Sequence, residues 1–331
     1  MKYRQLGSSG FEVSVMAFGA WQLGDPTYWG EDEQAAGADA VVAATDAGIN
    51  LFDTAEGYGA GESERALGRA LRGRRDKVYI ADKVSSNHGA PEQLRKSCED
   101  SLRRLGTDYI DIYQVHWPFR DVSFEDAYAE MQRLKDEGKI RAVGVSNFGV
   151  KDLESWVAIG ECVSDQFGYN MLFRAIEHEI VPVCRKHGVG ILAYMPLMQG
   201  ILAGRWRNLD DIPQPRRRTR HFSSTRPGTR HDEPGCEQLL TETLSQLDAI
   251  ANAMGQSPAD IALAWTMARP WITSIIVGGR NPAQVLCNVA AVDLELDGST
   301  AARLDEITNP LKEHLGPNAD MWCGEADCRI R

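Results

Sequence analysis

The chain has 331 residues, of which 43% are hydrophobic and 25% charged, and this composition excludes a largely disordered protein. The formal net charge of -11 excludes nucleic acid as the main partner, because phosphate backbones are bound through basic surfaces. The start, MKYRQLGSSG, has no apolar signal core, and no apolar run reaches the roughly 18 residues of a membrane helix. We therefore expect a cytoplasmic protein that does not contact a membrane.

The first 14 residues, MKYRQLGSSGFEVS, predict a small hairpin. Its turn is expected at Ser8 to Gly10, where small and flexible residues gather. Such a hairpin is expected to close the bottom of a barrel.

From about residue 15 to about residue 290, short apolar runs alternate with longer amphipathic stretches. The runs are VMAFGA from Val15, INLFDTA from Ile49, KVYIADKV from Lys77, YIDIYQVH from Tyr109, IRAVGVSN from Ile140, VSDQFGY from Val163, VGILAYMPL from Val189 and SIIVGG from Ser274. This alternation is typical of strand–helix units around a parallel sheet. The number of units predicts an α/β fold of the (β/α)₈ TIM-barrel type, forming a single domain over residues 1–331. A doubly wound sheet, which usually stops near six strands, is the alternative.

Helical periodicity is clearest over residues 64–71, 92–105 and 124–137. Ser63 and Ser123 precede two of these stretches and are expected to cap the helices.

Two segments interrupt the alternation. Residues 198–234 contain several prolines and the Arg-rich patch from Arg216 to Arg220, which fits either a functional lid or a solvated loop. The tail after Leu311, ending in DMWCGEADCRIR, is rich in Trp and Cys and is expected to pack over one end of the barrel.

The 7 cysteines are scattered, without the spacing of a zinc site, so we expect reduced thiols and no metal. A disulfide or metal site at Cys323 and Cys328 is the less favoured alternative.

Polar residues lie at the ends of three successive predicted strands. Asp53 ends the second strand and leads into a glycine-rich turn with Tyr58, the third strand ends at Lys83, and the fourth ends at His116. Because the C-terminal strand ends of such a barrel face one pocket, we expect these four side chains to converge.

These four residue types suit the reduction of a carbonyl group. A phenol titrates near pH 10, so it donates a proton at neutral pH only when its conjugate base is stabilised. Lys83 is expected to lower the pKa of Tyr58, Asp53 to hold Lys83 in place, and His116 to donate a hydrogen bond to the substrate oxygen. Each residue alone also fits a structural role, and their joint placement favours the site.

The motifs around these residues resemble the aldo-keto reductases. They are FDTAEGYG (residues 52–59), GESERALGRAL, ADKV around Lys83 and YQVHWP around His116. The resemblance extends from about Tyr3 to about Glu306 and implies a catalytic tetrad of Asp53, Tyr58, Lys83 and His116.

The resemblance also implies a site for a nicotinamide cofactor. Ser146, Asn147 and Gln166 match residues that hold the nicotinamide amide, and Tyr194 matches the tyrosine that stacks on its ring. The whole expected cofactor set is Gly19, Ala20, Trp21, Asp53, Ser146, Asn147, Gln166, Tyr194, Pro196, Leu197, Gly200, Arg205, Gly278, Gly279, Arg280, Gln284 and Asn288.

The stretch IIVGGRNPAQVLCN (residues 275–288) carries two glycines and Arg280 just before a predicted helix start, where free amides favour an anion. Arg280 matches the family position that meets the 2′-phosphate, so the resemblance implies NADP, with NAD possible. Val277, Cys287, Met195 and Arg205 depart from the usual family residues, Pro, Glu, Ser and Lys, and weaken that preference.

Aromatic side chains are expected to form the substrate pocket together with Tyr58 and His116. These are Trp21, Trp29, Trp117 and Phe148, and such walls suit aldehydes, ketones or sugars. One rival is a cofactor-binding regulatory protein resembling the potassium-channel β-subunits, although the chain begins directly with the hairpin and without an extended arm. Another is an isomerase or aldolase with Lys83 as a Schiff base, which the neighbouring Asp82 and Asp53 disfavour.

Overall fold

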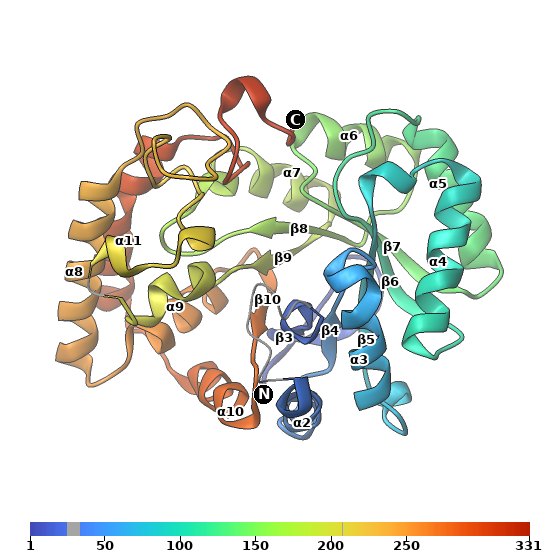
Figure 1. Cartoon of the computed structure of the whole chain (residues 1–331), viewed down its shortest axis with the longest axis horizontal. Coiled ribbons are helices and arrows are strands. Elements are labelled where there is room, and N and C mark those ends of the chain that lie inside the picture. The colour runs from blue at the N-terminus through green and yellow to red at the C-terminus, as the bar shows by residue number, and fades with distance from the viewer. Residues whose placement is uncertain (25–33, 207) are drawn as a thin grey trace.

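The computed structural model describes residues 1–24, 34–206 and 208–331 (Figure 1). In this described part, eight parallel strands close into a barrel in the order β10-β3-β4-β5-β6-β7-β8-β9. They are β3 (Met16–Gly19), β4 (Leu51–Asp53), β5 (Tyr79–Val84), β6 (Ile110–Val115), β7 (Ile140–Ser146), β8 (Ser164–Gly168), β9 (Gly190–Tyr194) and β10 (Ile272–Gly278). The predicted TIM barrel is therefore confirmed, and the doubly wound alternative was wrong.

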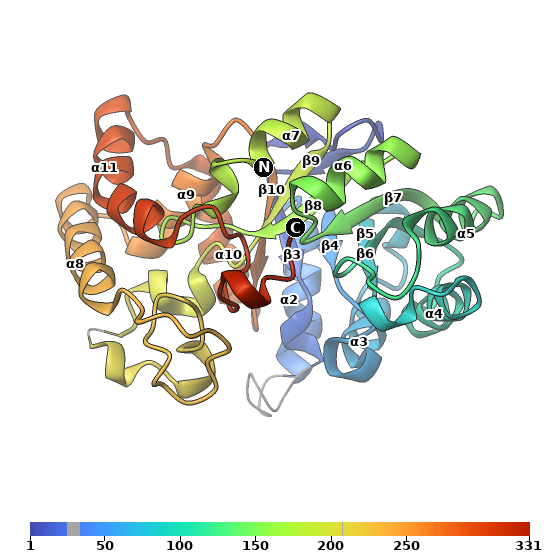
Figure 2. The same ribbon diagram turned by 90° about the horizontal axis from the view of Figure 1, so that it is seen from above.

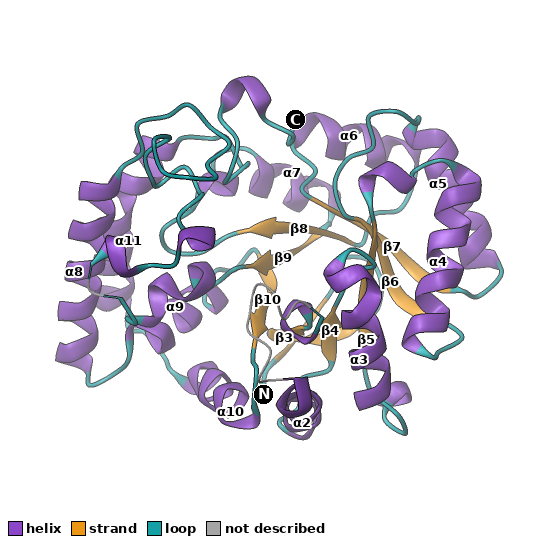
Figure 3. Cartoon of the chain, viewed as in Figure 1, coloured by secondary structure: helices purple, strands orange, loops and turns teal. Residues whose placement is uncertain are grey.

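Helices surround the barrel (Figure 3). They are α2 (Gln34–Asp46), α3 (Glu62–Ala70), α4 (Pro91–Leu105), α5 (Phe124–Asp136), α6 (Val150–Ile159), α7 (Ile180–His187), α8 (Glu237–Met254), α9 (Pro258–Met267), α10 (Pro282–Ala290) and α11 (Gly298–Leu315). The Ser123 side chain caps α5 by accepting a hydrogen bond from the backbone N–H of Asp126. The prediction for Ser63 was wrong. Helix α3 already begins after Gly61, and the buried Ser63 hydroxyl instead donates to the carbonyl of Ala20 at 2.7 Å.

The hairpin of β1 (Tyr3–Gln5) and β2 (Glu12–Ser14) closes the N-terminal end of the barrel. Its buried side chains Leu6 and Val13 join the cluster that fills the barrel interior. A Cβ added at Gly190, where β9 begins, would come within 2.9 Å of Leu6, so hairpin and strand ends are tightly packed. The functional end must therefore be the opposite, C-terminal end.

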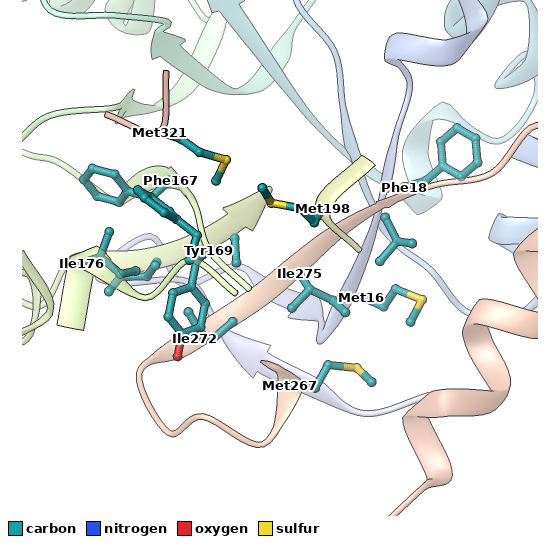
Figure 4. Packing of buried hydrophobic residues seen from close by; sticks show 14 of the residues in the cluster. Met16, Phe18, Phe167, Tyr169, Ile176, Met198, Met267, Ile272, Ile275 and Met321 are labelled. Atoms are coloured by element: carbon teal, nitrogen blue, oxygen red, sulfur yellow. The ribbon is translucent and has the colours of Figure 1, made fainter. Parts of the chain in front are cut away.

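The main core lies between the strands and the helices. It contains Phe18 of β3, Phe167 of β8 and Ile275 of β10, which Figure 4 shows among the buried side chains of this cluster. Because apolar side chains fill both the interior and this layer, the strand ends are rigidly placed.

Residues 198–206 and 208–234, together with the tail 316–331, interlock above the C-terminal strand ends, and we call them the cap (Figure 2). The buried Arg220 guanidinium donates to the carbonyls of Leu315 at 2.9 Å and Asn318 at 3.0 Å, and it pairs with Glu233 at 2.7 Å. A β-bridge also joins Arg230 to Cys323. The tail thus packs over one end of the barrel, as predicted. Its contacts with Arg220 and Arg230 hold this part of the segment 208–234 in place.

All 7 cysteines are free thiols, including Cys323 and Cys328, so the disulfide alternative was wrong. Within the described ranges, no group of three or more metal-ligating side chains comes together. Within the same ranges, none of the helices is both long and apolar enough to cross a membrane.

Candidate active site

A cleft of about 860 Å³ opens at the C-terminal ends of the barrel strands. It extends from Tyr58 and His116 at one end to Arg280 and Asn288 at the other, with the cap forming one side. This is the end of the barrel where strand-end side chains share a pocket.

The four predicted strand-end residues converge at one end of this cleft. Lys83 Nζ donates to Asp53 Oδ1 at 2.7 Å and to the carbonyl of Thr54 at 2.7 Å. The same ammonium lies 3.4 Å from the phenol oxygen of Tyr58. The His116 ring meets the Tyr58 ring edge-on at 5.6 Å between centroids. Asp53, Lys83 and Tyr58 therefore form a continuous chain of polar contacts that leads to the cleft.

A tight turn after β4 aims Tyr58 into the cleft. Gly59 has a φ of 58° and Ala60 a φ of 52°, both in the left-handed region. A Cβ on Gly59 would collide with the carbonyl of Gly24, so only glycine fits this close approach. The glycine at position 59 is thus required by the tight turn that places Tyr58 in the cleft.

Burial and charge together set the protonation of this group. Burial raises the pKa of Tyr58, and the nearby Lys83 charge offsets that rise only in part, so the expected net lowering was wrong. Burial lowers the pKa of Lys83, but Asp53 and Tyr58 raise it more strongly, so the amine stays charged. Burial, followed by the Lys83 charge, lowers the pKa of His116 to about 3. At neutral pH the site holds a neutral phenol, an ammonium and a neutral imidazole.

The predicted amide-binding residues lie beside this group. Asn147, whose φ is 63°, donates to the carbonyl of His116 at 3.1 Å and accepts a hydrogen bond from the Tyr194 hydroxyl at 2.9 Å. Gln166 Nε2 donates to Asp53 Oδ2 at 2.7 Å. The Ser146 hydroxyl donates to the carbonyl of Gln166 at 2.9 Å. These polar side chains hold one another in place at the cleft wall.

At the far end of the cleft, α10 begins directly behind Arg280. The predicted free amides at this helix start are partly occupied. Asn281 caps the helix by accepting from the Gln284 N–H at 3.0 Å, and the Arg280 N–H donates to Gln284 Oε1 at 3.0 Å. The side chains of Arg280, Gln284 and Asn288 face the cleft and remain the candidates for binding an anion there.

The Aldo/keto reductase family model matches residues 15–309. The chain belongs to this family.

Three relatives can each be aligned with almost the whole length of this chain. Aldo-keto reductase YhdN of Bacillus subtilis is 32% identical over 96% of this chain and 97% of its own length. The NADH-specific methylglyoxal reductase of Escherichia coli is 31% identical, over 94% and 100%. The aldo-keto reductase of Klebsiella pneumoniae solved with NADPH superimposes with a TM-score of 0.74 at 29% identity, covering 100% of this chain and 99% of that one.

Most residues that the sequence assigned to the cofactor line the cleft of this aldo/keto reductase. They are Gly19, Trp21, Asp53, Ser146, Asn147, Gln166, Tyr194, Pro196, Leu197, Gly200, Arg205, Gly278, Arg280, Gln284 and Asn288. Ala20 and Gly279 do not line it. Ala20 is fully buried and donates its N–H to the carbonyl of Asp53, and Gly279 packs against Val285 of α10. Both lie behind the wall of the cleft.

The expected substrate residues divide into three groups. Trp21 lies 5.9 Å from the Tyr58 ring, and both Trp21 and Trp117 line the cleft. The prediction that Phe148 lines the substrate pocket was wrong, because this residue is fully buried and stacks on Phe124 at 5.4 Å in the helical layer. Asn147, just before it, has a left-handed φ of 63°, which interrupts the alternation of side chains beyond the end of β7. Trp29 lies outside the described residues.

The sequence argument missed several lining residues. The tail supplies Trp322, whose ring is nearly parallel to that of Tyr194 at 10° and 6.4 Å, and Arg329, which lies over Trp117 at 3.9 Å. Gln22 and Arg230 also line the cleft. The tail residues could not be found by looking at strand ends, because the tail follows the last strand and α11. The sequence signal for them was the tail's unusual content of Trp and Cys.

Proposed function

We propose that this aldo/keto reductase reduces an aldehyde, ketone or sugar carbonyl to an alcohol, with Tyr58 as the proton donor. The observation that carries the proposal is the placement of the Lys83 ammonium 3.4 Å from the Tyr58 oxygen and 2.7 Å from Asp53. Negative charge develops on the carbonyl oxygen during reduction, and an ordered donor with a nearby cation stabilises that charge.

The cleft suits a nicotinamide dinucleotide. It joins an amide-binding cluster at one end to the guanidinium of Arg280 at the other. The Gln22 Oε1 atom of the cleft lining, which packs against Gly278, is buried with no hydrogen-bond partner in the described part of the chain. Arg280 fits a phosphate by its fork geometry, so we favour NADPH, with NADH possible. The solved Klebsiella pneumoniae relative holds NADPH, and the Escherichia coli methylglyoxal reductase relative is named NADH-specific.

When bound, the reduced nicotinamide supplies the hydride. The side chains of this chain then do three things. The neutral His116 imidazole donates a hydrogen bond that orients the carbonyl oxygen. Tyr58 gives its proton to that oxygen as the carbonyl carbon becomes tetrahedral. Lys83 stabilises the phenolate left behind, and Tyr58 regains a proton from solvent.

The protonation of the site favours reduction over alcohol oxidation at neutral pH. A phenol with a raised pKa keeps its proton and can donate it, whereas oxidation needs a phenolate base. A Schiff-base role for Lys83 is disfavoured, because Asp53 keeps its amine protonated and therefore not nucleophilic.

The test is a panel of aldehydes, ketones and sugars followed by loss of NADPH absorbance and repeated with NADH. Turnover of at least one carbonyl class supports the proposal and fixes the cofactor. Binding of NADPH without reduction of any carbonyl would contradict it and favour a regulatory role.

A further inference from the structure

Arginines gather in the cleft although the chain carries a formal net charge of -11. Six arginines line it, namely Arg205, Arg216, Arg218, Arg230, Arg280 and Arg329. Within the described residues, the acidic lining residue is Asp53, which is already paired with Lys83. A basic cleft in an acidic protein concentrates anions at the site.

Two of these arginines, Arg230 and Arg329, are associated with the aromatic lining residues Trp117 and Trp322. The Arg329 guanidinium lies 3.9 Å from the ring centroid of Trp117, the residue that follows His116. Arg230 is joined to Cys323 by a β-bridge, next to Trp322, whose ring is nearly parallel to Tyr194. The Arg329 guanidinium therefore lies against the aromatic wall next to His116, and the backbone of Arg230 lies beside the segment that carries Trp322.

Their charges are only partly balanced. Arg329 donates to the fully buried Asp320 through Nε at 2.7 Å and Nη2 at 2.9 Å, which leaves the Nη1 group outside this pair. Arg230 is exposed, and among the described residues no carboxylate lies within ion-pair distance of its guanidinium. About one positive charge remains, which suits a singly charged carboxylate better than a phosphate dianion.

We propose that the substrate is a carbonyl compound that also carries a carboxylate, held by Arg230 and Arg329. The body of the substrate lies against the wall formed by Trp117 and Trp322, whose rings meet edge-on at 6.5 Å between centroids, and its carbonyl reaches Tyr58. This assignment rests on the proposed reductase function and names the substrate class of that site.

The test compares three aldehydes of similar shape: 4-carboxybenzaldehyde, its neutral methyl ester, and 4-formylphenyl phosphate. We expect kcat/KM for the carboxylate to exceed that for the ester by about tenfold at low salt and the difference to shrink with ionic strength. Equal values for acid and ester would overturn the proposal. A preference for the phosphate over the carboxylate would overturn the carboxylate assignment.

Variants locate the effect. We expect Arg230→Gln and Arg329→Gln each to lower the ratio of kcat/KM for 4-carboxybenzaldehyde to kcat/KM for the ester about tenfold, the loss of one charge-assisted contact. Arg303→Gln removes the same charge from an exposed site on α11 and serves as the control. Arg329→Gln also disturbs the contact with Trp117, so Arg230→Gln is the decisive variant. An unchanged acid-to-ester ratio in Arg230→Gln would overturn its role.

A binding measurement separates this proposal from the reductase function. If no aldehyde is reduced, the proposed function fails. The anion site can still be tested by comparing the affinity for 4-methylbenzoate with the affinity for neutral 4-methylbenzamide. Tighter binding of the benzoate that disappears in Arg230→Gln supports the anion site. Equal binding of the two compounds overturns it.

Discussion

Asp53 uses its two carboxylate oxygens for two different partners: Oδ1 accepts from Lys83 at 2.7 Å and Oδ2 accepts from Gln166 at 2.7 Å. The carboxylate that holds the ammonium beside Tyr58 is thus also bonded to a proposed cofactor residue. The proposed cofactor-binding residue and the proposed proton donor are therefore linked through one buried polar contact, the Gln166–Asp53 hydrogen bond.

Replacing Gln166 by Ala should affect both properties. The variant loses a proposed contact to the nicotinamide amide and leaves Asp53 Oδ2 without its partner in a buried position. We expect KM for NADPH to rise and kcat to fall, each by about tenfold. Steady-state kinetics with a saturating aldehyde measure both, and a change in KM alone would contradict the coupling.

Replacing Arg280 by Ala should affect cofactor choice alone. The residue lies at the far end of the cleft from Tyr58, and the proposal gives it the 2′-phosphate. We expect KM for NADPH to rise about tenfold or more, with KM for NADH and kcat nearly unchanged. Parallel titrations with the two cofactors check this, and equal effects on both would show that Arg280 does not recognise the phosphate.

The pH dependence of reduction follows from the protonation of Tyr58 and His116. The pKa of His116 is about 3, so this imidazole does not change charge near pH 6–7. The pKa of Tyr58 is raised above its ordinary value of about 10, so the proton needed for reduction is lost only in alkali. We expect kcat/KM for a neutral aldehyde to be flat from about pH 5 to 9 and to fall above that range. A fall centred near pH 6.5 would assign the titration to a histidine instead.

A buried acid behind the site should make stability depend on pH. Burial, followed by repulsion from Glu64, raises the pKa of the fully buried Asp82 well above its usual range. Folding therefore favours the protonated form, and the free energy of unfolding falls as pH rises above the unfolded pKa of about 4. We expect Asp82→Asn to raise Tm by about 2–4 °C at pH 8 and to have little effect near pH 4.

The control for this stability effect is Asp211→Asn, at an exposed position in the cap. It should leave Tm nearly unchanged at both pH values. If Asp82→Asn instead lowered Tm relative to the parent protein at pH 8, while the two proteins had the same Tm at pH 4, the ionised carboxylate would be shown to stabilise the fold.

The barrel could be predicted because its signals are local. Each strand is an apolar run bounded by turn residues, and the run ending at Asp53 appears as β4. The strand-end rule then placed Asp53, Lys83 and His116 correctly, since neighbouring parallel strands must end at one mouth. Phe148 shows the limit of this rule, because one left-handed residue, Asn147, interrupts the alternation of side chains beyond the end of β7.

The cap could not be predicted in the same way. Trp322 and Arg329 follow the last helix, and their positions depend on contacts with residues far away in the sequence, such as Tyr194 and Trp117. The pKa of Tyr58 was misjudged for a related reason. The sequence shows that Lys83 is close, but the degree of burial, which outweighs the charge, depends on the whole packed site.

The most direct test of the central claim is the kcat of Tyr58→Phe, which removes only the phenol oxygen that lies 3.4 Å from Lys83. The account predicts a loss of about 10³-fold in kcat, with the affinity for NADPH, measured by fluorescence titration, nearly unchanged. Turnover equal to that of the parent protein would contradict the assignment of Tyr58 as the proton donor.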